Sequence, residues 1–426
     1  MTDATPTTAA TAAAGESPYP MLYGDAFAAD PRAAYDRLRA AGPVATAEIA
    51  PNVRALVVTS YRAALSVLKD ERNFSKDPRR WRDLAEGRVP EDSPVLAFMA
   101  YRPSLQYADG ADHTRLRQAM DDCLSRVDPH DLREVTRRAT LTAINDVAPA
   151  GHADLMTALA DVVPLMVVTE LLGCHAELAE RMVAGCRGMI SAGPGAEQAA
   201  AEFAACLMEL IQLKQERPGR DVTSWMVAHP AGLNVEEIVH QLVVLVGPGT
   251  IPMASWIAYS LWLLLTDDAS VGDLAQGTIT VRRALEKALW EYAPMANFSV
   301  HYARVPTVVE GVEIPAGVPV MISHAAANTD PSLPAELGYS SRAHLAFSAG
   351  PHRCPAVGLA TVIATTTIET VMDRLWDMQL AAPGEQPVNR HGPFHQCPVS
   401  MHVRFPPKTA TALTAAHSAS HTGGAP

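Results

Sequence analysis

The spacing of apolar residues divides the chain into a mixed first part, a long helical middle and a strand-rich stretch near residue 300. Residues 30–41 place apolar side chains at helical intervals, whereas 55–59 form an apolar run rich in β-branched residues, which predicts a strand. From about 112 to 270 the spacing is helical almost throughout, and 298–325 predict strands around a turn. The pattern predicts a mainly α-helical fold with a small β-rich region.

The most apolar stretch lies at about 242–265, and two prolines interrupt it. Pro248 and Pro252 are one turn apart in a predicted helix, next to Gly247 and Gly249. Each proline removes an amide donor and crowds the preceding turn, which costs about 3 kcal/mol in an ordinary helix interior. The stretch therefore predicts a buried, strongly opened helix with unpaired carbonyl groups, and not a membrane span. The alternative is a kinked buried helix without catalytic meaning.

The two ends of the chain are predicted to be disordered tails on either side of one domain. Residues 1–18 are rich in Thr and Ala and contain no Lys or Arg, so they lack the basic start and the apolar core of a signal peptide. Residues 407–426 consist mostly of Ala, Thr, Ser, His and Gly. The segment 19–406 fits one large compact fold.

Charge and cysteine content narrow the function classes. The chain has 34 Lys and Arg against 46 Asp and Glu, a net charge of −12, which argues against nucleic-acid binding. Its 6 cysteines are scattered without a CxxC pair, so neither a disulfide framework nor a zinc site is indicated. With no predicted membrane anchor, these features favour a soluble cytoplasmic protein.

One octet, from Phe347 to Cys354, carries candidate metal chemistry. Its spacing, Phe-x-x-Gly-x-His-x-Cys, is expected by chance in roughly 2 of 10,000 chains of this composition. Gly350 permits a tight turn, and we expect the loop amides and Arg353 to favour the ionised thiol. A lone thiolate suits a haem iron, because the porphyrin supplies the other four ligands. The alternative is a structural cysteine in a loop.

At these residues the chain resembles the cytochrome P450 family, whose cysteine loop reads Phe-Gly-x-Gly-x-His-x-Cys-x-Gly. Ser348 and Ala356 stand here in place of two of the glycines. The resemblance implies the cytochrome P450 fold, with haem b buried between a distal helix and the cysteine loop, and Cys354 as the iron ligand. It extends over residues 20 to 405 and includes the segments 112–117, 153–173, 311–317 and 327–331.

The resemblance also implies a set of haem-binding residues. His113 and Arg117 are four residues apart on a predicted helix and share one face, so both can reach the haem propionates. His301 falls where the family often has a propionate-binding arginine, and His352 lies in the cysteine loop. The alternatives are an ordinary amphipathic helix and a half-exposed strand histidine. Arg304 is close in sequence, and strand alternation leaves its direction open. Phe347 and Gly350 complete the cofactor-binding set.

The predicted distal helix departs from the family pattern at its catalytic positions. Thr250 occupies the position of the family's threonine, whereas Gly249 replaces the acid that precedes it. Thr250 can hydrogen-bond dioxygen or a proton-carrying water. Without a carboxylate at 249, we expect protons to come through water in the opened helix or from a polar group of the substrate.

A second departure affects the helix before the cysteine loop. The family's Glu-x-x-Arg pair falls at Lys287 and Trp290, and the position of a third arginine falls at Tyr339. The buried ionic network is therefore predicted to be missing. We expect Trp290 to fill its space by aromatic packing and Glu286, one residue out of register, to point elsewhere, since a complete replacement by packing residues can be nearly neutral in free energy.

The substrate-contacting positions implied by the resemblance mix apolar and amide side chains. They suit a mid-sized, partly polar small molecule with aromatic or amide groups, such as a cyclic dipeptide, although such residues are also common in protein cores. The positions are Val243, Val246, Met295, Asn297, Phe298 and Gln396.

Three functions remain open at this point. The first is a monooxygenase that acts on a secondary metabolite with electrons from a ferredoxin and its ferredoxin reductase. The second is an oxidative coupling enzyme that joins C–C or C–N bonds, and the third is a non-catalytic haem protein. A ferredoxin is expected to dock near the cysteine loop, where Arg353 and Arg117 can meet its acidic face.

Overall fold

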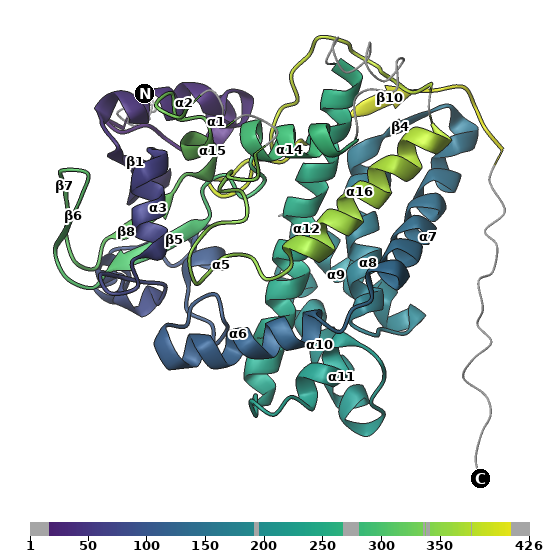
Figure 1. Ribbon diagram of the computed structural model, residues 1–426, viewed down its shortest axis with the longest axis horizontal. Coiled ribbons are helices and arrows are strands. Elements are labelled where there is room, and N and C mark those ends of the chain that lie inside the picture. The colour runs from purple at the N-terminus through teal and green to yellow at the C-terminus, as the bar shows by residue number, and fades with distance from the viewer. Residues whose placement is uncertain are drawn as a thin grey trace, which may run out of the picture.

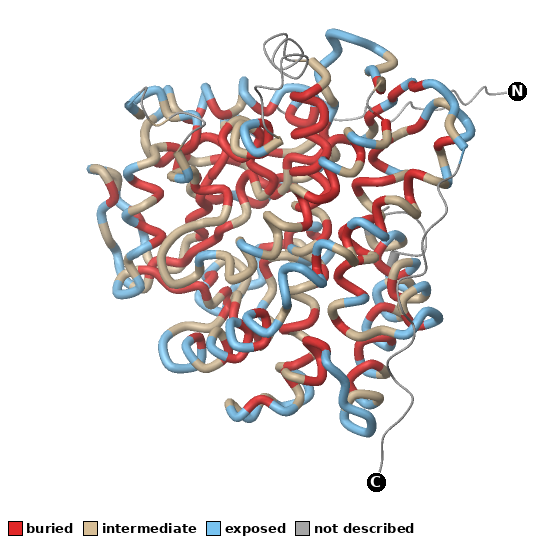
Figure 2. Tube along the Cα trace, turned by 45° about the vertical axis from the view of Figure 1, so that its right-hand side comes forward, coloured by how far each residue is buried: buried red, intermediate tan, exposed pale blue. Residues whose placement is uncertain are grey.

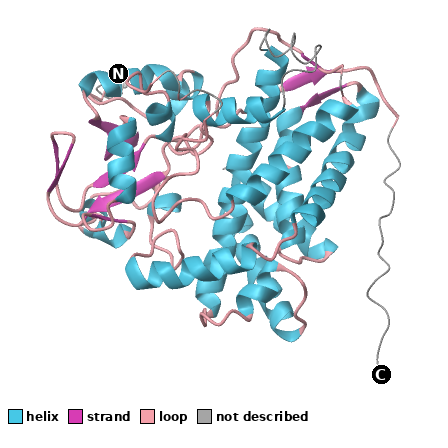
Figure 3. Ribbon diagram, in the orientation of Figure 1, coloured by secondary structure: helices cyan, strands magenta, loops and turns pink. Residues whose placement is uncertain are grey.

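The structure is a computed structural model that describes residues 17–190, 196–266, 281–334, 337, 341–375 and 377–409. Most of both predicted tails, 1–18 and 407–426, lies outside the described residues, as does Tyr339. The described part is mainly helical, as predicted. Most of its strands lie at the left of Figure 3, and a smaller group lies at the upper right.

The helices of the described part include the two longest elements, α12 and α10. The α-helices are α1 Gly24–Ala29, α2 Pro31–Ala41, α3 Tyr61–Lys69, α4 Arg82–Ala85, α5 Leu96–Met99, α6 Gly110–Leu124, α7 Pro129–Val147, α8 Val163–Leu171, α9 Ala176–Ile190, α10 Ala196–Glu216, α11 Val222–Val227, α12 Val235–Thr266, α14 Val281–Glu291, α15 His324–Asn328 and α16 Val357–Arg374. Short helical turns are η1 Pro78–Arg80, η2 Ala148–Ala150 and η3 Met156–Ala160.

Local sequence signals set several helix starts. The Asp30 side chain accepts from the amides of the first turn of α2, and Asp128 does the same for α7. A proline follows each cap, at the first helical position, where the missing amide costs nothing. Pro129 is therefore the first residue of α7, and Pro149 lies in the turn η2 that follows the helix.

Three small sheets hold the strands. The main sheet has the order β1-β2-β8-β5-β3, with β2 and β8 parallel and the other pairs antiparallel. The strands are β1 Val44–Ala50, β2 Val53–Val58, β3 Phe74–Ser75, β4 His152–Asp154, β5 Ser299–Ala303, β6 Thr307–Val309, β7 Val312–Ile314, β8 Pro319–Ile322, β9 Gln379–Leu380 and β10 His402–Arg404. The predicted strand at 55–59 is part of β2, and the predicted turn after Ile314 separates β7 from β8.

Helix α12 runs through the middle of the molecule, and α16 crosses it (Figure 1). It also packs against α8 and α14, and its second half is buried in the core (Figure 2). By length and composition alone α12 could cross a membrane, but 56% of its most apolar window is buried inside the protein. The helix is a core element, as the sequence predicted.

Contrary to expectation, α12 is not strongly opened at its two prolines. The helix continues from Val235 to Thr266 with Pro248 and Pro252 inside it. The Thr250 hydroxyl donates to the carbonyl oxygens of Val246, at 2.7 Å, and Gly247, at 3.2 Å. These bonds do not replace the missing proline amides, whose acceptors would be the carbonyls of Val244 and Pro248. The packing of α8, α14 and α16 against α12 therefore holds the backbone helical there.

Candidate active site

A tight loop just before α16 positions Cys354. The Cys354 amide donates to the Phe347 carbonyl at 3.0 Å, and the Arg353 amide donates to the Gly350 carbonyl at 3.1 Å. Gly350 has φ 70°, and a Cβ at this position would lie 2.1 Å from the carbonyl oxygen of Leu68. Only glycine fits here, because the loop passes directly against the end of α3.

Ser348 holds a conformation that usually favours glycine. Its φ is 60°, and its hydroxyl is buried without a hydrogen-bond partner. A left-handed conformation costs a non-glycine residue about 1–2 kcal/mol. Ser348 stands where the family has a glycine and still adopts a positive φ, so the rest of the loop imposes this backbone conformation.

The thiol of Cys354 is harder to ionise than the sequence suggested. Burial raises its pKa, while the Ala356 amide and the charges of Arg117 and Arg353 act in the opposite direction. The predicted favourable groups are present, but desolvation outweighs them. A coordinated metal ion deprotonates a thiol outright, so the loop is suited to a thiolate when iron is bound.

Three of the predicted propionate ligands come together beside the loop. The rings of His113 and His352 are 4.0 Å apart at an angle of 37°, and His113 Nε2 and His352 Nδ1 are buried without partners. His301, on β5, is buried and its Nδ1 lies 3.4 Å from the Ser299 carbonyl. Burial holds the pKa values of all three histidines below their ordinary range.

Arg117 is on the same face of α6 as His113, but it reaches the backbone of the cysteine loop. Its Nη1 donates to the carbonyl oxygens of Pro351, at 3.0 Å, and Arg353, at 2.7 Å. Its Nε lies 2.9 Å from Asp121. The side chain thus fastens α6 to the loop that carries the cysteine.

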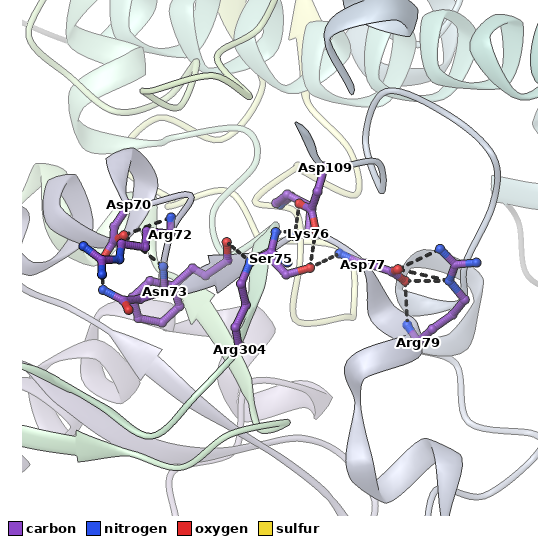
Figure 4. A network of polar contacts seen from close by, with 10 residues as sticks. Asp70, Arg72, Asn73, Ser75, Lys76, Asp77, Arg79, Asp109 and Arg304 are labelled. Atoms are coloured by element: carbon purple, nitrogen blue, oxygen red, sulfur yellow. Dashed lines mark hydrogen bonds and ion pairs between the residues drawn. The ribbon is translucent and has the colours of Figure 1, made fainter. Parts of the chain in front are cut away.

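Arg304, whose direction the sequence left open, pairs with Asp109 at 2.8 Å. Asp109 also accepts from the Ser75 hydroxyl and from the Lys76 amide, at 3.0 Å (Figure 4). Lys76 itself is a buried residue next to His301, which the sequence analysis missed. Nothing in the sequence indicates this, because a lysine just after a short strand usually points to solvent.

The two positions predicted to be catalytic, Gly249 and Thr250, both lie on α12. Thr250 is buried, and a Cβ at Gly249 would meet only Val168 Cγ2, at 3.6 Å. Of the two predicted substrate positions on this helix, Val246 is buried and Val243 is partly exposed. Both lie against the apolar cluster beneath α9, α10 and α11.

An aromatic cluster surrounds Phe298, one of the positions that the resemblance assigned to substrate contact. The Phe98 ring, on α5, lies 6.1 Å from Phe298, 5.0 Å from Phe394 and 5.5 Å from His395. Phe298 is partly exposed, as is the nearby Met295. The cluster therefore brings aromatic rings from three separate parts of the chain into contact.

Two of the predicted substrate residues have structural bonds instead of an open position. The buried Asn297 amide donates to the Tyr35 hydroxyl at 3.1 Å and to the Pro393 carbonyl at 2.7 Å. The Gln396 backbone amide donates to the Pro294 carbonyl at 3.1 Å, and its side-chain oxygen is buried without a partner. Both residues fasten the turn around Phe394 to the loop after α14.

The region that replaces the ionic network differs in part from expectation. Trp290 packs edge-on against His344 at 6.0 Å and donates to the Ser341 carbonyl at 3.0 Å, so it fills the space as predicted. Glu286 does not point elsewhere: its carboxylate lies 3.4 Å from His344 Nε2 and 3.6 Å from Arg342 Nε. The prediction of a wholly missing network was wrong, because the segment before the cysteine loop folds back over α14.

The residues present fit a haem group. The loop with Gly350 at its turn carries the partly buried thiol of Cys354. Beside it lie two buried histidine nitrogens without partners, on His113 and His352, and the buried cation of Lys76. Thiolate ligation and hydrogen bonds to two carboxylates are what this cofactor requires. Fold and site together define a haem-thiolate oxidoreductase.

Comparison with known proteins agrees with this class, although no family model matches the chain. Cytochrome P450 monooxygenase PikC of Streptomyces venezuelae is 30% identical over 85% of this chain and 88% of its own length. The 2-hydroxy-5-methyl-1-naphthoate 7-hydroxylase of Streptomyces carzinostaticus is 26% identical over 84% of this chain and 90% of its own. The solved structure of CYP154C4 from Streptomyces sp. W2061 superposes with a TM-score of 0.82 at 25% identity, covering 91% of this chain and 98% of that one.

The chain belongs to the cytochrome P450 family. It is a haem b oxidoreductase related to monooxygenases that act on secondary metabolites, and such enzymes draw electrons from redox partners.

Proposed function

We propose that this protein is a cytoplasmic monooxygenase that inserts oxygen into a mid-sized aromatic or peptide-derived secondary metabolite with electrons from a ferredoxin and its reductase. The observation that carries the proposal is the geometry of the cysteine loop. Gly350 lies directly against the Leu68 carbonyl, and the Cys354 amide donates to the Phe347 carbonyl. In this proposal Cys354 is the iron ligand, and His113, His301 and His352 face the propionates. Arg117 acts from α6, and its bonds to the loop carbonyls support a role in positioning Cys354.

Bound haem supplies dioxygen activation, which the thiolate favours by donating electron density to the iron. On the distal side, the Thr250 hydroxyl donates a hydrogen bond to the Val246 carbonyl. Its oxygen lone pairs can still accept a hydrogen bond from a water molecule. Gly249 offers no carboxylate to pass protons on. Water near α12, or a polar group of the substrate, therefore delivers the protons.

The aromatic cluster supports an aromatic ring in the substrate. Phe98, Phe298 and Phe394 meet at centroid distances of 5.0 to 6.1 Å, the range of favourable ring contacts. One relative named above is a hydroxylase of a substituted naphthoate, a bicyclic aromatic acid. Val243, Val246 and Met295 supply further apolar surface. The side-chain oxygens of Asn297 and Gln396, which are buried without partners, supply polar groups.

The ferredoxin docking face is proposed at the cysteine loop. Arg353 is exposed directly beside Cys354, and Arg117 lies under the same loop. Arginines beside the shortest route to the iron attract an acidic partner and speed its association. Charge reversal at Arg353 is expected to slow ferredoxin-dependent reduction and to leave reduction by dithionite unchanged.

The visible spectrum of the reduced protein under carbon monoxide tests the proposal. A strongly red-shifted Soret band is expected for the wild type, and Cys354→Ser should abolish the shift. An unshifted carbonyl band in the wild type would contradict the proposed proximal site. Product mass then separates one added oxygen atom from loss of two hydrogens or dimerisation, the signs of the coupling alternative.

A further inference from the structure

Lys76 has a buried ammonium group whose hydrogen-bond acceptors among the described residues are neutral. The residue is 8% exposed, and its Nζ donates to the Val300 carbonyl at 2.8 Å and to the Ser299 hydroxyl at 3.4 Å. Within the described ranges no carboxylate oxygen lies within 4.0 Å of Nζ. Burial lowers the pKa of Lys76 to about 7. Such a group is costly in the folded protein unless an anion joins it.

The nearest acid is already engaged with other donors. Asp109 pairs with Arg304 at 2.8 Å and accepts from the Ser75 hydroxyl and the Lys76 backbone amide (Figure 4). It fixes the backbone at the end of β3, while the Lys76 side chain runs to β5. The positive charge of Lys76 therefore remains available for an anion.

Strand register explains why Lys76 points toward the haem-binding histidines. β3 pairs antiparallel with β5, Phe74 opposite Ala303 and Ser75 opposite Tyr302. Continuing that register by one residue brings Lys76 opposite His301, the position where the family often carries an arginine. The cation that His301 does not supply at neutral pH is thus provided from the neighbouring strand.

The surroundings of Nζ are those of an anion site. Burial is the main cause of the lowered pKa values of His113, His301, His324 and His352, and the charge of Lys76 lowers all four further. All four rings therefore lie within the field of Lys76. Two of these rings also hold the buried nitrogens without partners, His113 Nε2 and His352 Nδ1. The exposed Glu71 lies near the same two rings, its carboxylate oxygen within 4.8 Å of their nitrogens. A buried cation beside imidazole nitrogens that have no partner is suited to a carboxylate ligand.

We propose that Lys76, directly after β3, binds a haem propionate and replaces the arginine that the family often carries at the position of His301. The inference rests on the haem pocket proposed above and adds a residue that the cysteine motif does not contain. Lys76 would contact the propionate edge of the haem, far from the reacting atoms. Its expected effects are on haem retention and on the reduction potential.

The test compares Lys76→Met with Lys69→Met, since Lys69 is an exposed lysine at the end of α3. Each purified holoprotein is mixed with excess apomyoglobin, and the rate of haem transfer is followed by absorbance. Lys76→Met should lose haem about tenfold faster or more, the factor that corresponds to about 1.4 kcal/mol for a hydrogen bond to a charged group. Its reduction potential should fall, because an uncompensated propionate favours the ferric state. Lys69→Met should match the wild type.

A second arm separates propionate binding from a structural role. The apoproteins are reconstituted with haem and with haem dimethyl ester, whose propionates carry no charge. If Lys76 binds a propionate, wild type and Lys76→Met should lose the ester at the same rate. An equal effect of the mutation with both haems would assign Lys76 a purely structural role and overturn the proposal, as would no effect with natural haem.

Lys76→Arg covers the case in which Lys76→Met does not fold. The arginine keeps the charge, so it should retain natural haem within a few-fold of the wild-type rate; loss as fast as with the ester contradicts the proposal. The reduced carbon monoxide spectrum of the wild type is recorded in the same series. An unshifted band there is a failure of the Cys354 assignment, which is distinct from any result at Lys76.

Discussion

At the residue scale, the cysteine loop depends on two positive-φ positions that the sequence treats differently. Gly350 is required by contact, because a Cβ would lie 2.1 Å from the Leu68 carbonyl oxygen. Ser348 has φ 60° without glycine, so its backbone is strained and its buried hydroxyl is unpaired. Local strain of this kind persists only where surrounding contacts determine the backbone. Here the closing bonds are those of Ser348 to Leu345, at 2.7 Å, and of Cys354 to Phe347.

Gly249 is the residue at which proton delivery can be tested. A side chain fits there, because an added Cβ meets only Val168 Cγ2 at 3.6 Å. Gly249→Asp should restore a carboxylate next to Thr250 and raise the product formed per NADPH consumed, about twofold or more if proton delivery limits coupling. Gly249→Asn is the matched control of equal size without an acid.

The measurement is the ratio of product to NADPH and to hydrogen peroxide released. If Asp and Asn change coupling equally, the effect is steric. An unchanged ratio in both variants would show that the missing acid does not limit this enzyme.

At the scale of elements, α14 and the segment before the cysteine loop form one packed unit. Trp290 is 4% exposed, packs on His344 and donates to the Ser341 carbonyl. Glu286, one turn earlier on the same helix, faces His344 and Arg342. Aromatic packing and one carboxylate therefore tie α14 to the loop, where the family uses a glutamate and arginines.

Trp290→Ala should destabilise the protein strongly and loosen the cysteine loop. Loss of a buried tryptophan costs about 3–5 kcal/mol, and the Ser341 carbonyl loses its donor. Urea unfolding of the apoprotein and the haem content after purification measure the two effects. Trp290→Phe keeps most of the packing and removes only the hydrogen bond, so it should cost about 1–2 kcal/mol and retain haem. Equal loss in both variants would mean that the hydrogen bond, and not the packing, holds the unit.

At the scale of the whole molecule, buried histidines make stability depend on pH. Burial lowers the pKa values of His324 and His395 from 6.5 to about 4. Below pH 6.5 the unfolded chain takes up protons at these positions, whereas the folded protein does so only near pH 4. The free energy of unfolding should therefore fall as pH drops through this window, by up to about 1.4 kcal/mol per pH unit for each histidine.

Urea unfolding at pH 7.5, 6.5 and 5.5 measures this slope. His395→Phe keeps a ring against Phe98 and removes one titrating group, so it should flatten the slope between pH 6.5 and 5.5. A slope equal to that of the wild type would show that His395 is protonated in the folded state, contrary to its burial among aromatic rings.

The sequence by itself determined the fold class, the cysteine loop and the α12 position of Thr250. Each of these depends on local information: helical periodicity, glycine at a turn, and the spacing of Phe347, Gly350, His352 and Cys354. The predicted strand at 55–59 and the predicted strands within 298–325 were confirmed for the same reason. Periodicity and motif spacing depend on one stretch of the chain, so they can be recognised without knowing which other segments pack against it.

Only the tertiary structure decided which polar groups meet. The Lys76 ammonium bonds a carbonyl 224 positions away, and Arg117 bonds one 234 positions away. Glu286 meets His344 because the chain folds back over α14, and α12 stays helical through its two prolines because neighbouring helices pack against it. The direction of a charged side chain depends on which groups lie opposite it in the folded protein. A single sequence does not record which distant segments become neighbours.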